Sequence, residues 1–123
     1  VIRPALEAGT WVVCDRFSDA TAAYQGAGKG VPADLIERLA AAAHPALVPD
    51  RTLVFDCSFE ISRKRLQGKT LDRFEREERA FFERVRAAYL ERSRAEPQRI
   101  RVVDASLPLP EIRKALERAL SDL

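Results

Sequence analysis

Several residue types are scarce in this sequence of 123 residues, which has no methionine, two cysteines and one histidine. The cysteines, Cys14 and Cys57, are too few for a disulfide-stabilised scaffold, and with His44 as the single histidine no zinc-type ligand spacing exists. We therefore expect no directly bound metal, and two buried free thiols in a reducing cytoplasm. No run approaches the roughly 18 apolar residues of a membrane-spanning helix, so we expect no membrane association.

Methionine is absent even from the first position, which is Val1. A complete open reading frame begins with methionine, so we expect that the natural start is either processed or missing. The first residues also show no basic start followed by an apolar signal region.

Charge of one sign is scarce overall but concentrated locally. Hydrophobic residues make up 46% of the chain, enough for a packed core, and 21 basic against 19 acidic residues leave a net charge of +2. Residues 63–101 hold 13 basic and 7 acidic residues, a net charge of +6, while the rest holds 8 and 12, a net charge of −4. A basic segment predicts a polyanionic ligand such as nucleic acid, phosphates or an acidic partner, and a solvated helix with ion pairs is the alternative.

Short apolar runs alternate with helical patterns along the chain. Three β-rich runs are predicted as buried strands: Thr10 to Asp15, Thr52 to Asp56 and Ile100 to Asp104. Helices are predicted at Val1 to Ala8 (closed by Gly9), from Phe17 onward, at Leu35 to Ala43, Phe59 to Leu66, Phe74 to Tyr89 and Ile112 to Leu123. This alternation predicts the α/β class with a parallel sheet flanked by helices.

An aspartate ends each predicted strand: Asp15, Asp56 and Asp104. Ligands of open parallel sheets bind outside the carboxyl ends of the strands, so these positions are candidate site residues. For Asp56 and Asp104 a cap on the following turn is an equal alternative.

A glycine-rich stretch, Gly26-Ala27-Gly28-Lys29-Gly30, looks superficially like a phosphate-binding loop. Such a loop needs G-x-x-x-x-G-K-[ST], but position 23 is Ala23 and the residue after Lys29 is Gly30. We predict a glycine-rich connector instead.

Arg16 and the residues after it form the first candidate site. An arginine at a strand end can hold phosphate oxygens with two parallel hydrogen bonds, and Asp15 beside it can orient the guanidinium or hold a metal-bound water. Helical continuation places Thr21, Tyr24 and Gln25 within about one turn of each other. A hydroxyl, an aromatic face and an amide suit a nucleoside pocket, although an ion pair followed by a packed helix remains an even alternative.

A second candidate is the basic stretch Arg63-Lys64-Arg65 with Lys69 and Leu71-Asp72-Arg73-Phe74-Glu75. Phosphoryl transfer requires positive charge around the moving group, and basic residues around Gly68 between two helices suit a flap over phosphates. A solvent-exposed linker with spare charge is the alternative.

Taken in order, these motifs resemble the thymidylate kinase family in its bacterial form, over essentially the whole chain. The matching segments are Asp15-Arg16-Phe17, Ala23-Tyr24-Gln25-Gly26, Gly28-Lys29-Gly30, Pro49-Asp50, Thr52 to Asp56, Leu71-Asp72-Arg73-Phe74-Glu75, Phe81 to Leu90 and Val102-Val103-Asp104-Ala105. The resemblance implies a P-loop kinase fold and transfer of the γ-phosphoryl group of ATP to dTMP, with Mg²⁺, giving dTDP.

The resemblance also implies roles for single residues. Arg16 would contact the acceptor phosphate, with Asp15 supporting the phosphate and metal network. Thr21 and Gln25 would lie at the thymine, and Tyr24 beside the deoxyribose. The implied catalytic residues are Asp15, Arg16, Arg65 and Lys69, and the implied ATP and lid residues are Arg63, Arg65, Lys69, Arg73, Asp104 and Ala105.

The family's first strand and P-loop have no counterpart in this sequence. We therefore expect residues 1–123 to be the C-terminal part of one nucleoside monophosphate kinase domain, with a lid near 63–75, inactive alone and dimeric in the complete protein. The alternative is a non-catalytic binding or assembly module that kept the fold. Nucleic-acid binding is disfavoured, because acidic residues are interleaved with the basic ones and no nucleic-acid-reading motif is present.

Overall fold

The computed structural model describes residues 1–66 and 75–123, so Lys69 and Arg73 of the predicted lid lie outside the described residues. Helices and strands alternate as the sequence predicts. In chain order the elements are α1 (Ile2–Glu7), α2 (Ser18–Thr21), η1 (Ala22–Gly28, a π-helix), α3 (Ala33–Ala43), β1 (Thr52–Asp56), α4 (Phe59–Arg65), α5 (Glu75–Ala95), β2 (Ile100–Asp104) and α6 (Leu109–Leu120).

The two strands pair in parallel, which confirms the predicted α/β class. Thr52 is opposite Ile100, and Asp56 is opposite Asp104. Because the strands run the same way, both aspartates lie at one edge of the sheet, and the connection between them passes through α4 and α5.

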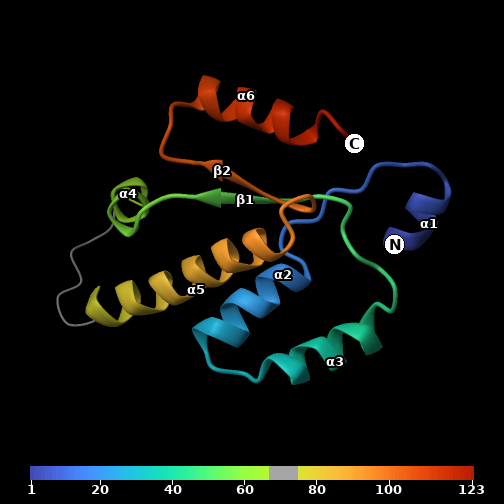
Figure 1. Ribbon diagram of the computed structural model, residues 1–123, viewed down its shortest axis with the longest axis horizontal. Helices are drawn as coiled ribbons and strands as arrows, with labels where there is room; N and C mark the ends of the chain where they lie inside the picture. Colours follow the sequence, from blue (N-terminus) through green and yellow to red (C-terminus); the bar gives the residue numbers. More distant parts are fainter. Residues whose placement is uncertain (67–74) are drawn as a thin grey trace.

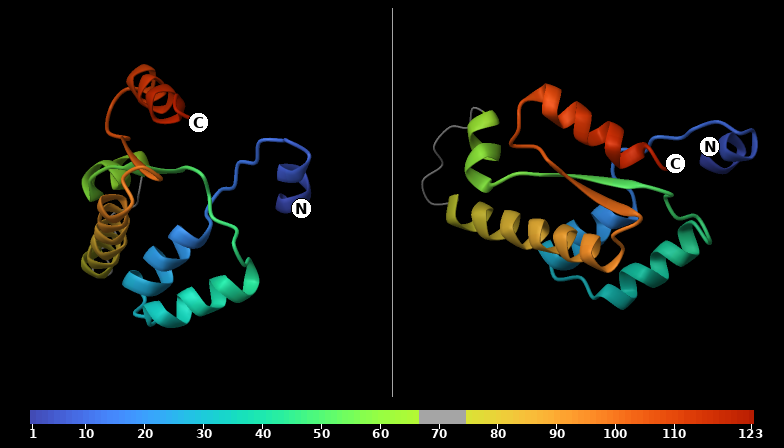
Figure 2. Two further views of the ribbon diagram at one scale, coloured as in Figure 1. Left: turned by 45° about the vertical axis from the view of Figure 1, so that its right-hand side comes forward. Right: turned by 45° about the horizontal axis from the view of Figure 1, so that its top comes forward.

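Helices cover both faces of this sheet. In Figure 1, α6 lies on one side of the strands, while α5 lies on the other with α2 and α3 beyond it, and both views of Figure 2 agree. Apolar side chains from the sheet and α5 meet between these layers. Val54, Val85, Ile100 and Val103 are the buried ones among them, and Phe59 of α4 is buried as well. None of the helices within residues 1–66 and 75–123 has the length and apolar character to cross a membrane.

The end of α1 follows the predicted glycine stop. Gly9 has a left-handed φ of 76°, the amide of Gly9 donates to the Leu6 carbonyl and the amide of Thr10 donates to the Ala5 carbonyl. This pair of bonds is a Schellman motif, which a glycine at this position favours because it has no Cβ.

The strand predicted at Thr10 to Asp15 is absent, so that expectation is wrong for this structure. Among the described residues the sheet is β1 and β2 alone, and a strand without a neighbour has no partners for its backbone groups. The apolar side chains of this segment are consequently in solvent, with Trp11 72% and Val13 95% exposed. Cys14 is exposed and Cys57 half-buried, so both are free thiols but the expected burial of Cys14 is also wrong.

Candidate functional site

Three predicted nucleotide-binding residues, Thr21, Tyr24 and Gln25, lie on one continuous helical run formed by α2 and η1. The run is α-helical through Thr21 and π-helical from Ala22 to Gly28. Because it extends through the first glycines of the stretch, the predicted connector is correct for Lys29 and Gly30 but not for residues 26–28. π-helical turns are rare and occur frequently at functional sites.

Gly28 allows η1 to approach α5 closely. A Cβ at this position would be 2.6 Å from Phe81 Cε2, closer than side-chain atoms approach each other. The guanidinium of Arg84 also donates to the Gly28 carbonyl, with Nη2 at 3.1 Å and Nε at 3.3 Å. Two contacts therefore fix the end of η1 on α5.

The side chains of Thr21 and Gln25 are exposed, while Tyr24 is half-buried. The Tyr24 ring packs against Phe81, with 6.1 Å between centroids, and meets Tyr89 edge to face at 6.3 Å. Burial, followed by the neighbouring Tyr24, raises the pKa of Tyr89 above its usual range. Phe81 and Tyr89 of α5 therefore hold the Tyr24 ring in place. The Thr21 hydroxyl and the Gln25 amide remain accessible to a ligand.

Arg16 lies over this ring. Its guanidinium carbon is 4.8 Å from the centroid of Tyr24, a cation–π contact, and the Arg16 backbone is left-handed with φ of 62°. Non-glycine residues rarely adopt this conformation, and those that do cluster at functional sites. The structure therefore brings together Arg16 and Tyr24, although Asp15 and Arg16 follow an irregular segment rather than a strand end.

Asp19 is a central residue that the sequence reasoning missed. Its side chain accepts hydrogen bonds from Arg92 of α5, from Arg99 just before β2 and from Thr52 of β1, and the residue is 3% exposed. Burial alone raises the pKa of this carboxyl, but the hydrogen bonds from Arg99, Arg92 and Thr52 outweigh it and hold the pKa at about 2. Asp19 is thus an ionised carboxylate inside the fold.

Sequence gave little sign of this cluster, because Arg92 and Arg99 are distant in the chain. One usable signal is the position of Asp19, which is next to Ala20 and four residues before Ala23 and therefore shares their side of the helix. Both alanines are buried. A carboxylate on the apolar side of a helix requires a buried partner.

The remaining predicted residues lie near the carboxyl ends of the strands. Asp56 accepts both a 2.7 Å bond from Arg86 Nε and a 3.1 Å bond from Nη2, and its carbonyl accepts from the Ala105 amide at 2.8 Å. The carboxylate of Asp104 accepts from the Ser106 amide at 2.9 Å and from the Ser106 hydroxyl, which is the turn cap considered as the alternative.

The basic residues of α4 come after the carboxyl end of β1. Arg63 forms an ion pair with Glu78 of α5, with Nη1 and Oε2 2.7 Å apart, whereas Arg65 is exposed. These residues follow Asp56, the last residue of β1, while Asp19 is bonded to Thr52, the first. The structure thus brings Arg16 into contact with Tyr24, whereas Arg63 pairs with Glu78.

Metal ligation by this chain is restricted. Within residues 1–66 and 75–123 no group of three or more His, Cys, Asp or Glu residues has the arrangement to hold an ion. Asp15 is exposed, so its carboxylate is accessible from solvent.

Known proteins match the chain along nearly its whole length. The family model described as thymidylate kinase matches residues 1–116. A thymidylate kinase from Bordetella petrii is 56% identical over 124 residues, covering 100% of this chain and 60% of the relative. One from Nitrosomonas eutropha is 53% identical over 117 residues, covering 94% and 54%.

Structural comparison agrees with the sequence matches. The crystal structure of thymidylate kinase from Ehrlichia chaffeensis has a TM-score of 0.69 and 25% identity, covering 99% of this chain and 56% of that chain. The fold is of the P-loop kinase type, and this chain spans about 60% of the length of the first curated relatives it matches. The match to residues 1–116 and the order of the motifs lead to one assignment: the chain belongs to the thymidylate kinase family.

Proposed function

We propose that the natural polypeptide carrying these residues transfers the γ-phosphoryl group of ATP to dTMP. The bond between the γ-phosphorus and the β,γ-bridging oxygen breaks, a bond to a phosphate oxygen of dTMP forms, and the products are ADP and dTDP. The observation that carries the proposal is the stack of Arg16 on Tyr24, next to the exposed Thr21 and Gln25 on the same helix.

Arg16 is the residue we assign to the acceptor phosphate. A guanidinium presents two parallel N–H donors to phosphate oxygens, which orients the attacking oxygen and neutralises charge as the phosphoryl group moves. Its cation–π contact with Tyr24, 4.8 Å from the guanidinium carbon to the ring centroid, restricts where the guanidinium lies before the substrate arrives. Asp15 precedes it and is assigned to support this phosphate network.

The helix residues supply the nucleoside contacts of this proposal. The Tyr24 ring would lie beside the deoxyribose, where it would crowd a ribose 2′-hydroxyl. The Gln25 amide has both a donor and an acceptor for the edge of the thymine, and Thr21 offers a hydroxyl one turn away. Both polar side chains are exposed, as a ligand-binding role requires.

ATP is assigned to the other group of residues. Arg65 is exposed at the end of α4 and, with Lys69 and Arg73, supplies positive charge over the phosphates; Arg63 stands beside it in its pair with Glu78. Asp104 and Ala105 are assigned to the adenine. Mg²⁺ accompanies ATP in such reactions and screens its phosphates. Asp15 is assigned to a water of that ion.

We further propose that residues 1–123 are part of one nucleoside monophosphate kinase domain with a lid near 63–75. The 123-residue polypeptide by itself is expected to lack activity, because its sequence contains no G-x-x-x-x-G-K-[ST] loop to hold the ATP phosphates. We place the reaction in the cytoplasm, where free thiols such as Cys14 and Cys57 persist.

Ligand-dependent melting of the natural polypeptide tests the substrate class. dTMP should raise the melting temperature more than dAMP or dCMP do, and mixing with ATP and Mg²⁺ should yield dTDP. Equal shifts with all three nucleotides would contradict the thymidylate assignment. A selective shift without product would favour the alternative of a non-catalytic binding module.

A further inference from the structure

We propose that Asp19 is a positioning residue that sets the height and rotation of the nucleotide-binding helix, defined here as residues 18–28. This inference deepens the proposed function and rests on it for its kinetic consequences. Nothing in the motif pattern assigns Asp19 a role, and its side chain faces the protein interior rather than a ligand.

The geometry of the Asp19 anchor is that of a clamp around one carboxylate. Arg92 donates to Oδ1 from Nη2 at 2.7 Å and from Nε at 3.0 Å. Arg99 donates to Oδ2 from Nη1 at 2.8 Å and to Oδ1 from Nη2 at 2.9 Å, and Thr52 Oγ1 donates to Oδ2 at 2.9 Å. The five bonds use both oxygens, so the carboxylate has little freedom to rotate or shift.

The partners of Asp19 belong to the ends of the two strands and of α5. Thr52 is the first residue of β1, Arg99 immediately precedes β2 and Arg92 lies in the last turn of α5. Arg99 is itself held by Glu96, whose Oε2 accepts from Nη2 at 2.7 Å. The anchor therefore ties the nucleotide-binding helix to the sheet and to α5 at the same point.

Asp19 is close in sequence to the residues that the proposed function uses. It lies three residues after Arg16, two before Thr21 and five before Tyr24. Farther along the helix, Tyr24 contacts Tyr89 and Gly28 contacts Phe81 and Arg84, so the helix runs antiparallel to α5 with one attachment at each end and one between. Loss of the Asp19 attachment frees the end nearest Arg16 and Thr21.

A carboxylate is needed at this position, because all five surrounding groups donate. Asparagine retains the shape of the side chain but replaces one acceptor oxygen with an NH₂ donor that faces the donors of Arg92 or Arg99. The positive charges of both arginines then lose their buried counter-charge. Asp19→Asn thus displaces the helix with almost no change in side-chain volume.

The test compares Asp19→Asn with Asp34→Asn in the natural polypeptide. Asp34 also faces an arginine, Arg38 at 3.8 Å, but both side chains are largely exposed. We expect Asp19→Asn to raise the KM for dTMP about tenfold or more, because a misplacement near 1 Å is costly, while the KM for ATP changes less than about twofold. Asp34→Asn should leave both constants unchanged.

A second readout does not depend on the reaction. Backbone amides of residues 22–28 should exchange with deuterium faster in Asp19→Asn than in the parent, while those of α6 should not change. If the parent has no dTMP kinase activity, the proposed function fails, and this readout alone decides whether Asp19 anchors the helix.

Milder variants keep the test decisive if Asp19→Asn does not fold. Thr52→Val removes one donor, and Arg92→Lys replaces the two-donor contact with a single charge. Both should raise the KM for dTMP by smaller factors and accelerate exchange in residues 22–28. The effect of Arg92→Lys should be the larger, because Arg92 makes two hydrogen bonds to Asp19 and Thr52 makes one. An equal rise of both KM values, a loss of kcat alone, or unchanged exchange in the helix would overturn the inference.

Discussion

Arg16 holds a backbone conformation that side chains usually avoid, with φ of 62°. Such strain costs about 1–3 kcal/mol and persists only where surrounding contacts outweigh it. The cation–π contact with Tyr24, 4.8 Å from the guanidinium carbon to the ring centroid, supplies one such contact. The strain is therefore consistent with an arginine that is fixed in place before it meets a phosphate.

The Asp19 carboxylate makes the free energy of unfolding depend on pH. Its folded pKa of about 2 lies below the ordinary value of 3.8, so the folded state favours the charged carboxylate. The lowered pKa contributes about 2 kcal/mol to the free energy of unfolding above pH 4. This contribution is lost as the pH falls toward 2 and the carboxylate is protonated. Urea unfolding of the natural polypeptide between pH 5 and pH 2 measures this loss.

The control for the acid effect is the same titration of Asp19→Asn. Glu60, Glu96, Asp104 and Asp122 also have lowered pKa values and contribute their own acid dependence. Subtracting the variant curve from the parent curve isolates Asp19. A difference that stays constant from pH 5 to pH 2 would show that this carboxylate does not carry the effect.

At the scale of elements, the contact between η1 and α5 determines where Tyr24 lies. Gly28→Ala places a methyl group 2.6 Å from Phe81 Cε2, so either the Phe81 ring or η1 has to move. We expect a loss of about 1–3 kcal/mol in the free energy of unfolding, as in other overpacked cores. Urea denaturation of the natural polypeptide provides the measurement.

A smaller partner residue should restore this contact. Phe81→Leu removes the ring atoms nearest Gly28, so the double variant should be more stable than the sum of the two single changes predicts. Additive effects would mean that the close approach of the ring does not determine the packing of η1.

Sequence patterns predicted β1, β2 and the helices α3 to α6 well, because each has a strong apolar period or a clear stop signal. They failed at Thr10 to Asp15, whose β-rich composition cannot form a strand without a neighbouring one. They name Arg16 and Tyr24 as candidates, which the structure brings into contact, but not Asp19, since its partners Arg92 and Arg99 meet it only through folding. Local patterns do not encode such distant pairs.

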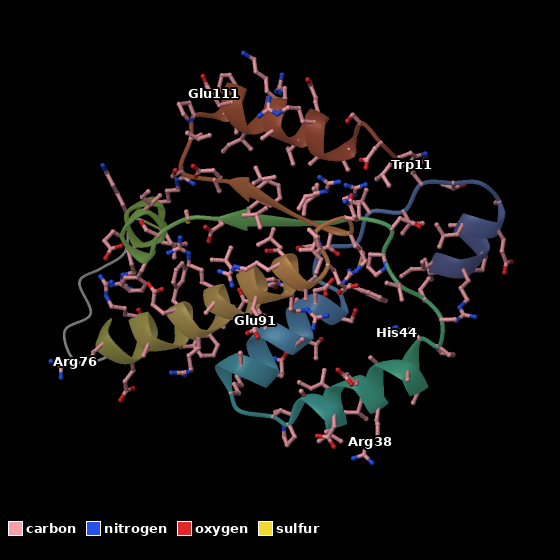
Figure 3. The ribbon with its side chains drawn as sticks, in the orientation of Figure 1. Trp11, Arg38, His44, Arg76, Glu91 and Glu111 are labelled. Atoms are coloured by element: carbon pink, nitrogen blue, oxygen red, sulfur yellow. The ribbon has the colours of Figure 1, made fainter. Side chains whose placement is uncertain are left out.

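At the scale of the whole molecule, much apolar surface of this chain is in solvent. Phe55 of β1, Trp11 and Val13 are all more than half exposed, and a parallel sheet of β1 and β2 is small by itself. In Figure 3, Trp11 lies away from the helical layer that includes α3, where Arg38 and His44 are labelled. These exposed apolar side chains could pack against further polypeptide.

The resemblance to the family implies a homodimer packed through helices, one of which corresponds to α3, and packing of this helix within the chain is the alternative. Ile36 of α3 is buried in the chain, whereas Leu35 is exposed and Leu39 is 60% exposed on the same helix. Leu39→Glu should weaken self-association of the natural polypeptide about tenfold or more, because it puts a charge into an apolar contact. Sedimentation equilibrium measures the effect.

Leu109→Glu is the matched control for the dimer prediction. Leu109 begins α6 and is also largely exposed, so the same substitution adds the same charge on another surface. Similar weakening by both variants would indicate a general effect of charge, and no weakening by Leu39→Glu would exclude α3 from the interface.

In the proposed reaction, Arg16 holds the acceptor phosphate of dTMP during phosphoryl transfer. Steady-state formation of dTDP by the natural polypeptide, compared with Arg16→Lys, tests it most directly. Lysine keeps the charge but loses the two-donor geometry, so kcat/KM for dTMP should fall about 10²-fold or more, while exposed Arg38→Lys on α3 has no effect. If the parent turns over dTMP and Arg16→Lys changes kcat/KM by less than about threefold, Arg16 does not hold the acceptor phosphate in this way.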